Sequence, residues 1–488
     1  MKKHNTLKVV IITLLLFALL TWILPCATYQ TEYTEVGRYQ AGLFDILSYQ
    51  STVLGYFGYV ALFVLVVGGF YGVLYKIGAY RRMLDSLAKK FKGKEVICLV
   101  VIMALFAFLT SFAGLQLALL MLFPFVISLV LMMGYNKLAA TAVTAGSVAV
   151  GLMGTTFSYN TTQVLQQYLS VEITDLIWAK VILLVLGVVL LSLFVLKFGK
   201  KASTKKVDDK AEFIPEEIKA VKEEKTTKAK DKDKEKSKAK DKKHKFKVWP
   251  LVLILDLILI VTILGFISWD NAFGITLFED VTTAITEFKL FGFPIFGKIL
   301  GGVSPFGYWN LVELITLMLL AIIILKFVYK IKWDDVFDGF GKGVKKALVP
   351  ALIVILIYTC LVLTTYDPYQ LVIYKFILGL TKGFNIFTTG LVVVISSIFN
   401  GDPLYAFYSV LPYFVSVVTD TNNYQLIAVI FQSLYGIVTL VAPTSIPLMV
   451  TLAYTNTSYK DWFKYIWKLL VALLVLAFIV FTALLLII

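Results

Sequence analysis

Long apolar runs separated by short polar segments make up most of the sequence. A helix needs roughly 20 residues to cross a bilayer, and most of the runs fit one crossing. The pattern therefore predicts an all-α polytopic membrane protein. The apolar runs lie at about 7–24, 55–76, 96–133, 138–171, 176–197, 249–268, 308–328, 346–365, 385–419, 425–457 and 465–488.

Two of these runs, 96–133 and 385–419, are too long for one crossing and too short for two full ones. Each has a polar, glycine-containing centre, at 110–116 and at 396–403. We interpret both as re-entrant hairpins with a tip near the middle of the membrane. The first is expected to open inward and the second outward.

Two further runs, 138–171 and 425–457, contain helix-breaking residues at their centres. The second reads Ala442-Pro443-Thr444-Ser445-Ile446-Pro447, and each proline removes a backbone donor from a helix interior. Irregular backbone at bilayer depth is tolerated where it is buried in protein or lines a cavity, so we predict two broken helices at a ligand site.

The distribution of cations between the runs predicts the orientation, because cytoplasmic loops carry excess Lys and Arg. The segments 26–54 and 269–307 hold acids and few cations, so they are expected outside. We predict a multi-pass plasma membrane protein with a cytoplasmic N-terminus and an external C-terminus. Its cytoplasmic loops are marked by Lys76, Arg81, Arg82, Lys89, Lys90, Lys92 and Lys94, by Lys326, Lys330, Lys332, Lys342, Lys345 and Lys346, and by Lys460, Lys464 and Lys468.

An internal repeat agrees with this scheme. A shift of 288 residues places Pro124 on Pro412 and Thr156 on Thr444. The two copies start from opposite sides, as in the inverted repeats of secondary transporters. We therefore expect an N-terminal repeat over 1–200, a Lys-rich cytoplasmic linker over 201–248, and a C-terminal half over 249–488 that begins with an extra helix at 249–268.

Two shorter stretches, 82–91 and 334–345, have apolar residues at helical spacing among charges. Such patterns are typical of helices that lie along the membrane surface. We expect both at the cytoplasmic interface.

Composition changes this picture little. The chain is 59% hydrophobic and has a mean hydropathy of +0.84, which excludes an ordinary soluble protein. Nearly half of the formal charge of +15 comes from 201–247, where 18 Lys face 11 acids. Without aromatic interleaving this segment predicts a disordered or partly helical linker that is drawn to anionic membrane lipid at most and has no nucleic-acid role. Cys26, Cys98 and Cys360 follow no metal or redox spacing, and the only histidines, His4 and His244, lie in hydrophilic segments.

Polar side chains at the tips and breaks are the candidate ligands for substrate or ion. A hard cation such as Na⁺ could bind oxygens of Thr156, Asn160, Asn400 and Thr444, and helix N-termini could face a substrate carboxylate. Alternatively, the hydroxyls only satisfy backbone groups freed by the breaks. The full candidate set is Ser111, Gly114, Gln116, Thr155, Thr156, Ser158, Asn160, Asn400, Gly401, Asp402, Thr444 and Ser445.

Three acids lie in or near apolar runs. Asp402, in the second tip, has the best functional claim, because a buried membrane carboxylate is costly. It could bind a coupling cation, take up a proton or pair with a substrate ammonium. Asp256 and Glu313 are more readily explained by structural pairing or an oligomer contact.

Three segments carry a family resemblance: Val441–Met449 with Tyr459–Trp462, Leu20–Pro25, and Gly68–Ala79. In these the chain resembles the YfcC-type family, labelled C4-dicarboxylate anaerobic carriers or basic amino-acid antiporters, of the ion transporter superfamily. The resemblance implies a scaffold part, a mobile part that moves as an elevator, and a homodimer. The chain departs from the family pattern at Leu115-Gln116, at 157–160 and at 400–403.

We expect a secondary active transporter, and no enzyme. Its solute would be a small carboxylate-bearing molecule (amino acid, short peptide or C4-dicarboxylate), coupled to Na⁺ or H⁺ or moved by exchange. Aromatic residues near the second tip and the lack of Lys and Arg in both tips favour amino acids or peptides. The alternatives are a non-transporting membrane scaffold that acts through its Lys-rich linker and, less favoured, a membrane enzyme on lipid-linked substrates.

Overall fold

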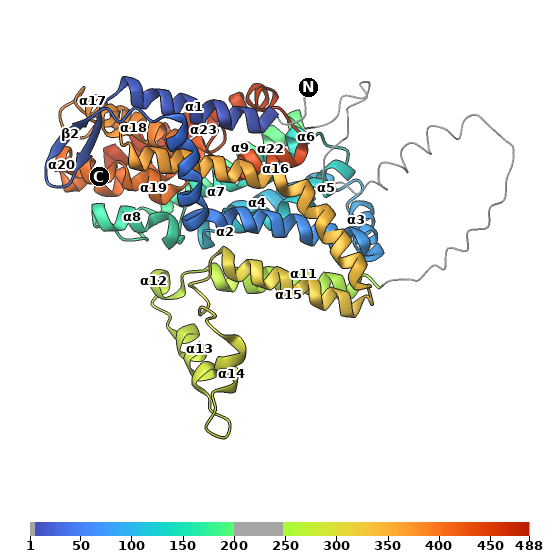
Figure 1. Cartoon of the computed structure of the whole chain (residues 1–488). Coiled ribbons are helices and arrows are strands. Elements are labelled where there is room, and N and C mark those ends of the chain that lie inside the picture. Colours follow the sequence, from blue (N-terminus) through green and yellow to red (C-terminus); the bar gives the residue numbers. More distant parts are fainter. Residues whose placement is uncertain (1–4, 200–246, 488) are drawn as a thin grey trace.

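The protein is a bundle of helices, seen in a computed structural model that describes residues 5–199 and 247–487 (Figure 1). Nearly all of the predicted linker at 201–248, which includes His244, lies outside the described residues. The other histidine, His4, also lies outside them. The two strands β1 (Cys26–Tyr29) and β2 (Tyr33–Gly37) pair as a hairpin at one end of the bundle. We call this the β-hairpin end, and the opposite end, where α3 (Gly78–Lys90) lies, the α3 end.

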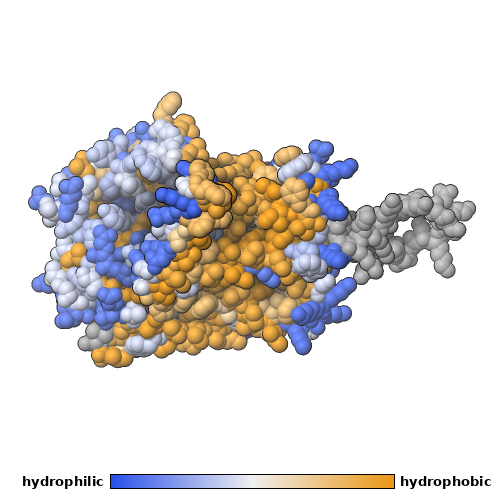
Figure 2. All heavy atoms as spheres, turned by 90° about the horizontal axis from the view of Figure 1, so that it is seen from below, coloured by the Kyte–Doolittle hydropathy of each residue, from blue (hydrophilic) through white to orange (hydrophobic). Residues whose placement is uncertain are grey.

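Among the described residues, eight helices are long and apolar enough to cross a membrane. Figure 2 shows, on the face in view, an apolar zone between two more polar ends, as expected of a surface in contact with lipid tails. The eight helices are α1 (Asn5–Ile23), α2 (Leu43–Lys76), α4 (Glu95–Ala113), α9 (Ile177–Phe198), α11 (Trp249–Phe266), α15 (Leu311–Val328), α16 (Trp333–Tyr366) and α23 (Tyr459–Ile487).

The 34-residue helices α2 and α16 pack closely against each other. Gly68 and Gly72 of α2 lie so near Gly343 and Gly339 of α16 that a methyl group on any of them would overlap the opposite backbone. Small residues at such spacing let two membrane helices approach and gain dispersion contacts. An ion pair between Lys76 and Asp338, 2.6 Å apart, lies at the α3 end of the contact.

This packing corrects one sequence prediction. The stretch 334–345 is not a separate surface helix, because it continues without interruption into α16. Gly339 and Gly343 face α2, which explains why the helix keeps these two residues although glycine lowers its intrinsic stability. The stretch 82–91 does form a separate amphipathic helix, α3.

The elements that follow α2 and α16 come in the same order. Each long helix is followed by a short helix, by helices joined at a turn, by an interrupted helix and by a long apolar helix. After α2 these are α3, α4, η1 (Ala118–Leu122), α5 (Phe123–Met132), α6 (Lys137–Thr141), η2 (Ala142–Gly146), α7 (Ser147–Met153), α8 (Tyr159–Leu169) and α9. After α16 these are α17 (Gln370–Leu378), α18 (Ile386–Phe399), α19 (Pro403–Tyr408), α20 (Leu411–Val417), η3 (Thr421–Asn423), α21 (Tyr424–Val438), α22 (Ile446–Thr455) and α23.

Helices α11 and α15 lie side by side on one flank of the bundle, and α15 also packs on α2 (Figure 1). The chain between them, residues 269–310, forms an arm that leaves the helix pair sideways (Figure 1). It contains α12 (Trp269–Phe273), α13 (Leu277–Glu287) and α14 (Ile295–Leu300).

Candidate functional site

The first tip is held against the first break. Helix α4 ends at Gly114, whose φ of 68° lies in the left-handed region that favours glycine. A side chain there would also collide with the Ser158 hydroxyl. The turn at Gly114 is followed by Gln116, which lines the same cavity as Leu152 near the end of α7.

Hydroxyl groups satisfy the backbone of the first break. The Ser111 hydroxyl donates to the carbonyl of Gly154 at 2.6 Å, and the amide of Thr156 donates to the carbonyl of Ser111 at 3.0 Å. Thr155 donates to Leu152 within its own turn, and Ser158 is paired with Thr161. These contacts support the structural alternative for Ser111, Thr155, Thr156 and Ser158, because a break in an apolar environment must find such partners.

The second tip is held against the second break in the same manner. A side chain at Gly401 would overlap the backbone of Thr444, and the Thr444 hydroxyl donates to the carbonyl of Ile398 at 2.9 Å. Tyr435 of α21 donates to the carbonyl of Gly401 at 2.8 Å. Together these contacts fix the tip on the break.

Two aromatic residues of α23 complete the second break, and the sequence marked both only through the family resemblance, without a role. The Trp462 indole donates to the carbonyl of Leu440 at 2.8 Å, and the Tyr459 hydroxyl donates to the carbonyl of Val441. Both carbonyls belong to the residues just after α21 ends. The contacts lie 18 and 22 residues apart in sequence, so no local pattern could reveal them.

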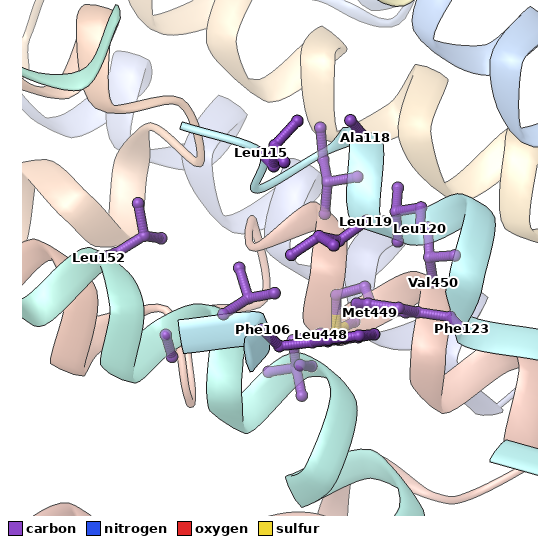
Figure 3. Packing of buried hydrophobic residues seen from close by; sticks show 14 of the residues in the cluster. Phe106, Leu115, Ala118, Leu119, Leu120, Phe123, Leu152, Leu448, Met449 and Val450 are labelled. Carbon is purple, nitrogen blue, oxygen red and sulfur yellow. The ribbon is translucent and has the colours of Figure 1, made fainter. Parts of the chain in front are cut away.

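The two interrupted helices cross beside these breaks. Gly436 of α21 lies directly against the backbone of Leu152 and Met153, the last residues of α7. Figure 3 shows Leu115 and Leu119 of the first tip region packed with Leu448 and Met449 of α22. The first tip region and the second interrupted helix therefore share one apolar core.

A small cavity lies where tips, breaks and α16 meet. From the predicted site it contains Gln116, Gly401, Asp402 and Ser445. Among the described residues, the lining holds one acid and no Lys or Arg. Its other residues are Leu117, Ala145, Val148, Leu152, Tyr358, Tyr435, Thr439, Ile446 and Pro447.

Asp402 is the charged group of this cavity. One carboxylate oxygen accepts from the amide of Leu404 at 2.9 Å and caps α19. Tyr358 and Tyr435 line the same cavity as the carboxylate. A carboxylate in a cavity that is also lined by aromatic side chains is suited to a cationic group.

Helix α22 presents its N-terminus to the same cavity, through Ser445, Ile446 and Pro447. The first amides of a helix lack partners within the helix, and the helix dipole favours an anion there. The Ser445 hydroxyl has no hydrogen-bond partner among the described residues. The cavity thus combines one group for a cation with one terminus for an anion.

The four predicted Na⁺ ligands are distributed over both breaks. Thr156 bonds to Ser111, whereas Thr444 bonds to Ile398. Asn400 is buried and its side-chain oxygen accepts from Thr364 at 3.3 Å, while Asn160 is exposed at the start of α8. No hydrogen bond between described residues joins Thr156 or Asn160 of the first break to the other two residues. A shared Na⁺ site therefore stays a prediction.

The other two acids lie apart from the cavity. Glu313 forms a capping box at the start of α15, where it accepts from the amide of Asn310 and from Ser304. Asp256 is exposed on α11. The structure therefore explains Glu313 by capping.

Comparison with known proteins agrees with the membrane architecture. A family model described as C4-dicarboxylate anaerobic carrier (DcuC) matches residues 4–486. No curated protein matches. Among solved structures, the Alcanivorax borkumensis YdaH transporter, reported to have an unusual topology, is similar, with 13% identity, a TM-score of 0.40 and 98% of each chain covered. The family match spans nearly the whole sequence, and the chain belongs to the C4-dicarboxylate anaerobic carrier family.

Proposed function

We propose that the protein is a secondary active transporter for a small solute that carries both a carboxylate and an ammonium group, such as an amino acid or short peptide. The observation that carries this proposal is that Asp402 and the N-terminus of α22 line the same cavity. A zwitterion matches both groups. A C4-dicarboxylate would place a second carboxylate near Asp402 with no Lys or Arg lining the cavity to offset the repulsion.

The proposed movement uses two parts of the chain. Helices α2 and α16 form a scaffold locked by their glycine contact, and the tips with the interrupted helices form a transport part. Tyr358 brings α16 into the cavity, so the solute would lie between the two parts. Such a site is exposed to alternate sides when one part moves as an elevator.

The repeated element order supports an inverted repeat with re-entrant tips. The cation-rich segments that follow α2, α15 and α22 make the α3 end cytoplasmic under the positive-inside rule. The N-terminus would then be cytoplasmic and the C-terminus outside, in the plasma membrane. Coupling to Na⁺ or H⁺, or exchange, is part of the proposal.

Uptake of labelled solutes into proteoliposomes tests the function. The purified full chain should accumulate an amino acid or peptide under an imposed Na⁺ or H⁺ gradient, or exchange it against internal solute. Absence of uptake across a panel of amino acids, dipeptides and C4-dicarboxylates would contradict transport. Preference for C4-dicarboxylates would contradict the assignment of Asp402.

A further inference from the structure

An aromatic contact joins the arm to the first tip. Phe273, the last residue of α12, lies 5.1 Å from Phe157 and 5.7 Å from Phe112, measured between ring centroids. Phe112 and Phe157 are themselves 5.4 Å apart. Phe112 belongs to the last turn of α4 and Phe157 to the first break, so the three rings, called here the aromatic clamp, connect the arm with the proposed transport part.

The arm side of the clamp is firmly built. Trp269 donates from its indole to the carbonyl of Leu264 at 2.8 Å, which fixes α12 on the end of α11. Trp309 lies against Gly265 with no room for a side chain between them. Successive ring contacts of 5.1–6.2 Å run from Trp309 through Phe306, Phe278 and Trp269 to Phe273.

Hydrogen bonds also stabilise the base of the arm, the part next to α11 and α15. Tyr308 donates to Glu279 at 2.5 Å and lies 3.3 Å from Asp270, which joins α13 to α12. Because α15 packs on α2, the base of the arm belongs to the scaffold. Phe273 is thus a fixed group that touches a part proposed to move.

We propose that the aromatic clamp is a latch that holds the transport part in the position seen here, at the end of its movement farthest from the α3 end. This inference rests on the proposed elevator movement. Since α12 follows the end of α11 away from the α3 end, displacement of the tip and break toward the α3 end would separate Phe112 and Phe157 from Phe273. Separation exposes ring surface and gives up specific ring contacts, so the clamp favours the position seen here.

Pulsed EPR can measure the position of the transport part relative to the scaffold, and it needs no known substrate. Spin labels would be placed on Val101→Cys in α4 and Leu320→Cys in α15, both lipid-exposed, in the full chain in nanodiscs. The native cysteines Cys26, Cys98 and Cys360 are buried. In Phe273→Ala, the population of the transport part near the α3 end should rise about tenfold relative to the population in the position seen here. Phe296→Ala, an exposed residue of the arm without contact to the tip, should leave the distances unchanged.

Unchanged distance distributions in Phe273→Ala would overturn the latch, whether or not a substrate has been found. A second experiment links the latch to transport. Crosslinking Phe157→Cys to Phe273→Cys should abolish uptake, and reduction should restore it. The matched pair Phe278→Cys and Phe306→Cys lies within the arm at 5.6 Å and should transport normally when crosslinked.

The outcomes separate the two proposals. Full uptake by the crosslinked Phe157–Phe273 pair would overturn the latch and leave transport standing. Absence of uptake in the uncrosslinked chain would contradict the proposed transport, while the EPR distances would still decide the latch.

Discussion

Tyr435 donates a hydrogen bond to the carbonyl of Gly401 at 2.8 Å, and both residues line the same cavity. The bond connects α21 with the tip that carries Asp402. The position of Gly401, and with it that of the tip, thus depends on a residue 34 positions away in sequence.

Replacement of this tyrosine should therefore weaken solute binding. Tyr435→Phe removes a hydrogen bond worth about 1 kcal/mol and leaves the Gly401 carbonyl unpaired. We expect the KM for uptake to rise about fivefold. Tyr424→Phe is the control, because Tyr424 makes a comparable bond, 3.0 Å to Val418, at the far end of the same helix; an equal effect in both variants would show that the cavity is not involved.

The adjacent hydroxyls of the second break should separate into two roles. Thr444→Ala removes the bond to Ile398 and should lower the free energy of unfolding by about 1–2 kcal/mol. Ser445→Ala removes a cavity hydroxyl without such a bond and should raise KM several-fold while the thermal midpoint stays within a degree or two. Thermal unfolding and uptake kinetics on both variants check this, and the reverse assignment would contradict it.

The scaffold contact should be sensitive to side-chain volume. Gly343→Val forces a side chain into the backbone of Gly68 and should destabilise the protein by several kcal/mol or prevent its accumulation. Gly341→Val lies two residues away with open space around it and should change stability far less. Thermal melting in detergent compares the two variants. Equal stability would show that the helices are not locked at this point.

Much of the architecture was accessible from the sequence because its signals are local. Apolar length predicted the membrane helices, and the proline and glycine pattern marked both interruptions, from Met153 to Tyr159 and from Val438 to Ile446. The segment 334–345 was misplaced because its charges suggest a surface helix, while Gly339 and Gly343 are explained only by contact with α2.

The cavity was less predictable, because its walls come from distant parts of the chain. Gln116, Gly401, Asp402 and Ser445 were found through the tips and breaks. Tyr358 sits within an apolar helix with no local sign of function, and Tyr435 resembles any buried aromatic residue. The roles of Thr155 and Thr156 could not be decided from composition, since a hydroxyl that binds an ion and one that bonds to a carbonyl look alike in sequence.

The central claim is that Asp402 pairs with the ammonium group of the solute. The direct measurement is uptake of the transported solute into proteoliposomes by wild type, Asp402→Asn and Asp420→Asn. Asp420 is the matched control because it also accepts from the amide two residues later, Asn422, but is exposed, and Asn preserves such caps. We predict that Asp402→Asn lowers kcat/KM at least 50-fold, in keeping with the loss of a charge-assisted bond, while Asp420→Asn stays within twofold of wild type. The account would be contradicted if Asp402→Asn took up the solute as well as wild type does. It would also be contradicted if wild type took up C4-dicarboxylates better than every ammonium-bearing solute.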